Sequence, residues 1–318
     1  MKNKYKNVIH YFNILKLIFL FLILLIITFE KKVKINIYNK LKVCICAPGK
    51  FENLYIREFI EHYQNYGVDK IFLYDNNEIN GEKFEDIIND YIENGYVEVI
   101  NFRGKKRIQL EMMNDCYIKN YLNYDWLIFF DLDEFIYLRD FKNIKKFLNN
   151  GRFKKCQRIQ LNWLFHTDNN LLYYDKRPIK ERFKQKSKKA RGVKTGGPQG
   201  IKSILRGHIP NITIRCPHIL NRNLSSCDGF GKPTKIVGIV TEKSDFYYYY
   251  IDHYYCKSTE EFIKKITKGD VLYKDGKMPK INNYFVLNEI TLEKIELIEK
   301  SIGYNLSKFR KYIKKNFL

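Results

Sequence analysis

The sequence of residues 125–135 is DWLIFFDLDEF, an apolar run that ends in three carboxylates, Asp131, Asp133 and Glu134. One residue separates Asp131 from Asp133, so on an extended chain their side chains point in the same direction. A solvated turn or a helix N-cap is one explanation for such acidic residues. However, two like charges held this close need a cation, and oxygen ligands suit a hard divalent ion such as Mg²⁺ or Mn²⁺. The motif therefore predicts a metal site at the end of a buried strand.

The hydrophobic periodicity around this motif alternates between strand and helix. Strands are expected at 41–48, 69–75, 96–102 and in the quoted run, with helices between them at 53–66, 82–94 and 108–122. This alternation predicts an α/β fold with a mostly parallel, Rossmann-like sheet flanked by helices. Ligands of such sheets bind at the carboxyl ends of the strands, where Asp75 and the acidic motif both lie.

The second half of the sequence has a looser pattern. We expect strands at 157–166 and 245–255, helices at 258–268 and 286–300, and a basic helical tail at 308–318. Residues 176–207 hold twelve Lys or Arg against one acid, Glu181, and are expected to form a long exposed loop. The whole chain carries a net charge of +22, which favours an anionic partner such as a nucleic acid, lipid headgroups or the phosphates of a nucleotide.

The N-terminal region contains an apolar segment, LIFLFLILLIITF, at residues 17–29. Extended back to Val8, it would form a helix of about 33 Å, enough to span a bilayer core of about 30 Å. No small residues follow as a cleavage site would require, so we expect one uncleaved transmembrane helix. Lysines flank both ends, and the orientation is therefore not decided by charge.

Cysteine usage gives little information about the compartment. The seven cysteines are too few and odd in number for a disulfide scaffold, and they are expected to be mostly core thiols.

Two alternatives to a sugar-nucleotide site share parts of this pattern. A phosphatase of the haloacid-dehalogenase type also has a strand ending in D-x-D, which would make Asp131 a nucleophile, and GDVLYKD at 269–275 fits its distal acidic spacing. Phosphatases of this class usually have Thr or Val at the position of Phe135, and their first motif normally lies at the start of the domain. Both points count against this alternative. A non-enzymatic polyanion-binding membrane protein would also explain the basic charge, but the sequence has no recognised nucleic-acid module, so no nucleic acid is expected.

Several ordered blocks of the sequence resemble glycosyltransferase family 92 and the related family-2-like group. The blocks are KFENLYIREFIEHYQNYGVDKIFLYDNNE, IQLEMMNDCYIKNYLNYDWLIFFDLDEF, NWLFHTDNNLLYYDKRPIKERF, KSILR, PHI and IDHYYCKSTEEFIKKITKGD. Phe51, Phe59, Glu78 and His166 depart from the family's usual residues. The resemblance covers roughly residues 41–270.

The resemblance implies a fold of the nucleotide-sugar transferase A type (GT-A). It also implies Mn²⁺ (or Mg²⁺) and the transfer of a hexose, with galactose as the family's example, from a nucleoside diphosphate sugar with inversion. A UDP-sugar donor and a glycan or other hydroxyl acceptor are expected. The expected domains are a cytoplasmic tip, membrane anchor and stem at 1–34, the GT-A-type domain at 41–275 and a helical tail at 276–318.

Roles can be assigned to individual residues on this basis. Asp131, Asp133 and His253 are expected to hold the metal and its diphosphate, with His253 carried over from the family. Asp75 would contact the base or ribose, and Lys202 would neutralise the diphosphate leaving group. An inverting transfer also needs a carboxylate to accept the acceptor's proton. The candidates for this base, in order of preference, are Asp168, Glu181 and Asp228.

The expected location depends on the source of the chain. Three N-glycosylation triplets begin at Asn211, Asn223 and Asn305, and they matter only if the domain is lumenal. In a eukaryote we expect a single-pass protein of the Golgi or endoplasmic reticulum with a lumenal domain. In a bacterium we expect an inner-membrane protein with a cytoplasmic domain.

Overall fold

The chain divides into two units, residues 1–41 and residues 42–318. The computed structural model describes residues 16–28, 41–106, 108–187, 199–234, 236–237, 240–241, 245–267, 277–303, 305–308 and 310–311. In the first unit, residues 16–28 form a helix whose side chains are exposed. Within the described residues, no helix is long and apolar enough to cross a membrane. The rest of the expected transmembrane segment lies outside the described residues, so the anchor stays a prediction.

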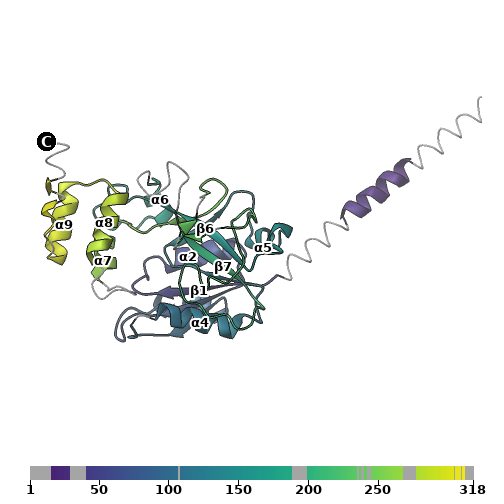
Figure 1. Cartoon of the computed structure of the whole chain (residues 1–318), viewed down its shortest axis with the longest axis horizontal. Helices are drawn as coiled ribbons and strands as arrows, with labels where there is room; N and C mark the ends of the chain where they lie inside the picture. The colour runs from purple at the N-terminus through teal and green to yellow at the C-terminus, as the bar shows by residue number, and fades with distance from the viewer. Residues whose placement is uncertain are drawn as a thin grey trace, which may run out of the picture. The chain divides into compact units, whose positions relative to one another are not determined.

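The second unit is an α/β domain (Figure 1). Its strands are β1 (Val43–Gly49), β2 (Lys70–Asp75), β3 (Val97–Asn101), β4 (Trp126–Phe129), β5 (Glu134–Leu138), β6 (Arg158–Phe165), β7 (Gln199–Arg206), β8 (Ser226–Cys227), β9 (Ile236–Val237), β10 (Val240–Thr241) and β11 (Tyr249–His253). Its helices are α2 (Ile56–Asn65), α3 (Glu85–Glu93), α4 (Gln109–Asn120), α5 (Ile144–Leu148), the 3₁₀ turn η1 (Gly151–Phe153), α6 (Ile179–Arg182), α7 (Thr259–Thr267), α8 (Lys277–Leu287) and α9 (Leu292–Ile302).

The main sheet has the strand order β3-β2-β1-β4-β7-β6-β11-β5. Its first four strands are parallel, as the alternating pattern predicts. The expectation of a mostly parallel sheet fails beyond β4, because β7 runs antiparallel to both β4 and β6, and β5 runs antiparallel to β11. The sheet is therefore mixed. We call the edge where β1, β4 and β6 begin the amino edge, and the edge where they end the carboxyl edge.

The sheet must curl strongly between β4 and β5. Three strands lie between these two in the sheet order, yet only residues 130–133 join them along the chain. Four strand spacings of a flat sheet measure about 19 Å, and the five Cα–Cα steps from Phe129 to Glu134 reach about 18 Å only when fully extended. The linker is not extended, because the Glu134 N–H donates to the Asp131 carbonyl oxygen at 3.1 Å. Curling therefore returns β5 to the end of β4.

Two apolar clusters support this sheet. One is formed by α4 with one face of β1, β2 and β4, and includes Cys46, Met112, Cys116 and Phe129. The other joins α7, α8 and α9, which lie side by side in Figure 1, and includes Phe262, Tyr284 and Ile295.

Three expectations for the second half of the sequence need correction. The stretch 176–207 is not simply an exposed loop, because it contains α6 and the central strand β7. The helix expected at 286–300 is in fact the end of α8 and most of α9. Most of the helical tail expected at 308–318 and all of GDVLYKD (269–275) lie outside the described residues.

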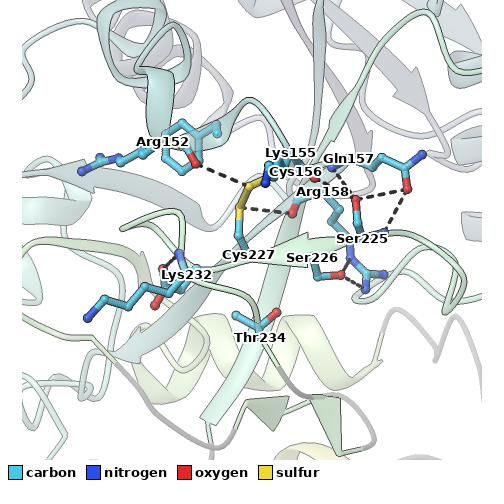
Figure 2. The surroundings of a disulfide bond; sticks show 12 residues. Arg152, Lys155, Cys156, Gln157, Arg158, Ser225, Ser226, Cys227, Lys232 and Thr234 are labelled. Carbon is cyan, nitrogen blue, oxygen red and sulfur yellow. Dashed lines mark hydrogen bonds between the residues drawn. A yellow bond between two sulfur atoms is a disulfide. The ribbon is translucent and has the colours of Figure 1, made fainter.

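The cysteines also differ from expectation, since four of the seven form disulfides. Cys46 on β1 pairs with Cys116 on α4, and Cys156 pairs with Cys227 on β8 (Figure 2). Cys44, Cys216 and Cys256 are free thiols. Spacing along the sequence could not indicate these pairs, because their partners are 70 and 71 residues apart.

Candidate active site

The site is built around the acidic turn, residues 131–134, which joins β4 to β5 at the carboxyl edge. The sequence suggested an extended D-x-D with both carboxylates on one side. Instead, Asp131 and Asp133 lie in a turn and contact different cations. Asp131 is one-third exposed, whereas the side chains of Asp133 and Glu134 are buried.

Lys202, on the central strand β7, neutralises one side of the turn. Its ammonium group is fully buried and lies 2.7 Å from Asp131 Oδ2 and 3.5 Å from Glu134 Oε2. Gln109, at the start of α4, is 3.5 Å from the other Asp131 oxygen. Burial alone would lower the pKa of Lys202, but Asp131 and Glu134 hold it above its usual value. Lys202, which was expected to neutralise a diphosphate, is therefore already paired with Asp131 and Glu134.

Lys265, on α7, neutralises the other side. Its Nζ lies 2.6 Å from Asp133 Oδ2, and His253 Nε2 of β11 lies 3.5 Å from Asp133 Oδ1. Burial would raise the pKa of Asp133, but Lys265 and His253 together hold it well below its usual range. Burial also lowers the pKa of His253, although Asp133 opposes this shift. Asp133 is thus ionised, and Lys265 is its principal counter-ion.

Glu134 behaves differently from its two acidic neighbours. Burial raises the pKa of Glu134 well above its usual value, and Lys202 only partly offsets this effect. The turn therefore places three carboxyl groups against the ammonium groups of two lysines, Lys202 and Lys265. The repulsion that the sequence suggested is already relieved by residues of the chain itself.

The donor atoms at this turn also fit a divalent cation. Asp133, Glu134 and His253 are buried, and each offers one ligand atom within 4.8 Å of the others. Among the described residues, Glu134 Oε1 and His253 Nδ1 are buried without a hydrogen-bond partner. Carboxylate and imidazole donors suit Mn²⁺. This trio contains two of the three predicted ligands, Asp133 and His253, with Glu134 in the place of Asp131.

Aromatic and histidine side chains that the sequence analysis did not single out line the same region. The ring of Trp163, on β6, is 4.7 Å from that of His253 and 5.0 Å from that of His218. Burial lowers the pKa of His218 to about 4, so its ring is neutral at pH 7. Trp163 Nε1 and His218 Nδ1 are further buried polar atoms that lack a partner in the described part of the chain. Such atoms are rare in folded proteins, and a cluster of them indicates a place for a ligand or ordered water.

Asp75 lies at the carboxyl end of β2, as predicted, but it is only 1% exposed. One carboxylate oxygen accepts from Arg103 Nε at 2.6 Å, and the other accepts from the Asn77 N–H at 2.8 Å. Arg103 also donates to the carbonyl oxygens of Ile79 and Glu82. These contacts favour a role for Asp75 in shaping the loop after β2 rather than in touching a nucleoside directly.

Asp168, the preferred candidate for the base, follows β6 at the carboxyl edge but is buried. Lys294 Nζ of α9 and the Tyr284 hydroxyl of α8 lie 2.7 and 2.6 Å from its Oδ2. Its Oδ1 accepts from the Asn170 N–H at 2.9 Å. Both oxygens are occupied and the side chain is 1% exposed, so this environment suits a structural ion pair better than a base.

We expect Asp168→Asn to lower the free energy of unfolding by about 3–5 kcal/mol, because Lys294 would lose its buried counter-ion. The catalytic rate per folded molecule should stay close to wild type at a temperature where the variant remains folded. Urea denaturation and single-turnover rates measure the two quantities separately. Wild-type stability combined with a large loss of rate would restore Asp168 as the base.

The other two candidates for the base lie away from the acidic turn. Asp228 follows Cys227, which pairs with Ile159 near the start of β6. His253, at the acidic turn, pairs with Phe165, which lies six residues or about 20 Å further along β6. Asp228 accepts hydrogen bonds from two N–H groups of its own turn. Glu181 is exposed on α6, where its neighbour Lys180 packs on Phe135. Phe135 follows Glu134 on β5 and so faces the opposite side of the sheet.

Solved structures that resemble this chain do so only distantly. S. aureus TarS 1–349 in complex with UDP-GlcNAc is 14% identical with a TM-score of 0.37, and the match covers 83% of this chain and 80% of that one. The mannosyltransferase PcManGT from Pyrobaculum calidifontis, in complex with GDP-Man and Mn²⁺, is 7% identical with a TM-score of 0.33, covering 87% and 76%. The longer S. aureus TarS structure is 12% identical with a TM-score of 0.34, and the match covers 86% of this chain but only about half, 49%, of TarS. We draw no functional argument from likenesses this weak.

A family comparison gives a stronger result. No curated protein matches the chain. The family model for glycosyltransferase family 92 matches residues 39–285, well over half of the 318 residues. This range includes the acidic turn, both of its lysines and His253. The chain therefore belongs to glycosyltransferase family 92.

Proposed function

We propose that the protein transfers a hexose, with galactose as the first candidate, from a nucleoside diphosphate sugar to a hydroxyl group of a glycan or another acceptor. The proposal includes dependence on Mn²⁺ or Mg²⁺, inversion at the anomeric carbon and a preference for UDP-sugars. The observation that carries it is the acidic turn at the carboxyl edge, where a member of a glycosyltransferase family gathers carboxylates, two lysine ammonium groups and unpartnered metal-ligand atoms.

The proposed roles follow from the contacts at the turn. Asp133, Glu134 and His253 would hold the cation, which when bound would supply positive charge against the diphosphate. Lys202 is fully buried, so we assign it a positioning role: it orients Asp131, whose partly exposed carboxylate faces the ligand. Asp168, Glu181 and Asp228 do not bring a free carboxylate to the turn, and we assign the proton-accepting step to none of them.

Membership of the family excludes the two alternative classes. The chain is a glycosyltransferase, so a dehalogenase-type phosphatase with Asp131 as nucleophile is set aside. A polyanion-binding protein without catalytic activity is set aside for the same reason. The anchor within residues 1–34, the limits 41–275 and 276–318, and a membrane location remain part of the proposal.

A panel of UDP- and GDP-sugars, incubated with the protein and Mn²⁺ or Mg²⁺, tests the proposed reaction. We expect slow hydrolysis of at least one donor, measured as release of the nucleoside diphosphate, and loss of that release with EDTA. Asp133→Asn should abolish it, whereas Asp86→Asn, which removes a charge from the exposed face of α3, should not. Hydrolysis that is unaffected by EDTA would contradict metal dependence, and no hydrolysis of any donor would contradict the proposed substrate class.

A further inference from the structure

The domain contains two disulfides, and both connect segments that are far apart in the sequence. The Cα atoms of Cys46 and Cys116 are 6.2 Å apart, and those of Cys156 and Cys227 are 5.9 Å apart. Structural disulfides persist in oxidising compartments and are rare in a reducing cytosol. The pairs therefore bear on the choice between a lumenal and a cytoplasmic domain.

The first bridge lies inside the core. Cys46 and Cys116 are fully buried and join the central strand β1 to the helix that covers it, α4. Cys44, two residues earlier on the same face of β1, is equally buried and stays free, and burial raises its pKa well above the usual value. A buried neutral thiol reacts slowly. The bridge is thus positioned as a structural link rather than a redox-active pair.

The second bridge holds a long segment with little regular structure. Residues 207–225 contain no helix or strand, and Cys227 ties their far end to the start of β6 (Figure 2). Beside the bridge, the Ser225 N–H donates to Gln157 Oε1 at 2.9 Å, and Arg158 Nε donates to Ser226 Oγ at 3.0 Å. This segment carries His218 to the active site. A covalent link at Cys227 adds to the hydrogen bonds at this end of the segment and restricts the unfolded chain.

Two N-glycosylation triplets lie on this same segment, at Asn211 and Asn223, and both asparagines are exposed. The Gly207 N–H donates to the carbonyl oxygen of Asp125, just before β4. Arg158 Nη1, at the start of β6, donates to the carbonyl oxygen of Asn221. These contacts place both ends of the segment at the amino edge, opposite the acidic turn. A glycan at either position would leave the active site open.

We propose that this is a lumenal domain that is oxidised at both cysteine pairs and glycosylated at Asn211 and Asn223. Each bridge forms when two thiols give up two protons and two electrons to the disulfide of an oxidoreductase, which becomes a dithiol. Each glycan is joined when the asparagine Nδ2 replaces the diphosphate on the anomeric carbon of a lipid-linked oligosaccharide. The amide proton is lost and the lipid diphosphate leaves. This proposal does not depend on the donor or metal proposed above.

The test uses the full chain, with its N-terminal segment, expressed in a eukaryotic cell and trapped with an alkylating agent before lysis. After denaturation without reductant, we expect label on Cys44, Cys216 and Cys256 only, and peptides that link Cys46 to Cys116 and Cys156 to Cys227. Enzymatic removal of N-linked glycans should shift the mass, and Asn211→Gln and Asn223→Gln should each remove one step. Seven labelled cysteines, or a mass unchanged by glycan removal, would overturn the proposal.

A matched pair of variants tests the structural value of the second bridge. Cys227→Ser should lower the Tm by about 10 °C, whereas Cys216→Ser, which alters a free thiol on the same segment, should leave the Tm and both linked peptides unchanged. If Cys227→Ser does not fold, titration of the wild-type protein with dithiothreitol gives the same comparison. A Tm that is insensitive to full reduction would show that the bridges are not part of the folded state.

Discussion

Asp133→Asn should lower the free energy of unfolding of the metal-free protein by about 3–5 kcal/mol, the usual cost of breaking a buried ion pair. The variant keeps the shape of the side chain but leaves Lys265 and His253 without their anion. From the sequence alone, the opposite sign is expected, because removing one of two adjacent carboxylates relieves repulsion. The structure reverses this sign, since each carboxylate already has its own lysine.

Urea denaturation in EDTA measures the free energy of unfolding of the metal-free protein. Two further variants show which contact is responsible for the change. Asp131→Asn should cost much less, because Asp131 is one-third exposed and Lys202 keeps Glu134 as a second neighbour. The double variant Asp133→Asn/Lys265→Met should recover part of the loss, because the two changes remove both members of one pair. Stability equal to or above wild type for Asp133→Asn alone would show that Lys265 does not act as the counter-ion.

Lys265→Met should increase the thermal shift that Mn²⁺ produces. In the metal-free protein, the Lys265 ammonium lies 2.6 Å from Asp133 Oδ2, where it competes with any cation that Asp133 would bind. Without the lysine, Asp133 loses its nearest cation and keeps His253 beside it, so the metal-free variant should have a lower Tm and bind Mn²⁺ at least tenfold more tightly. Calorimetric titration gives the affinity, and thermal unfolding with and without Mn²⁺ gives the shift.

The neighbouring variant Lys264→Met is the control for this experiment. Lys264 lies on the same helix, is largely exposed and pairs with Glu260, so its loss should change neither quantity. Equal Mn²⁺ affinities in the wild type and the Lys265→Met variant would show that the lysine and the cation do not share Asp133. An affinity that falls in the variant would indicate that Lys265 supports the bound state instead.

The local signals in the sequence were sufficient for the first half of the fold. Alternating apolar runs of strand and helix periodicity predicted β1 to β4 and α2 to α4 in the correct order. The central strand β7 was missed because its residues, QGIKSILR, continue a strongly basic stretch. Lys202 can be buried in a strand only because Asp131 and Glu134 meet it there, and these partners come from a distant part of the sequence.

The site was predicted in part for the same reason. The acidic residues could be recognised because they follow an apolar strand. His253 was predicted from the resemblance to the family. Lys265 and His218 had no comparable signal, since a lysine on an amphipathic helix and a histidine in a loop usually face solvent. The sequence placed Asp168 first among the three candidates for the base, but it could not show that Asp168 is buried and ion-paired with Lys294 of α9.

The short link between β4 and β5 has a consequence for how this protein can vary. Successive residues of β5 face opposite sides of the sheet, so adding or deleting one residue within 130–133 would exchange the sides of Glu134 and Phe135. The ring of Phe135, which packs against Phe59, His62 and Tyr254, would then turn toward the lysines. Surface loops usually tolerate changes of length, but the length of this turn fixes which residues of β5 face the active site. Single substitutions within the turn can be tested one at a time, whereas variants with an insertion or a deletion there should not fold.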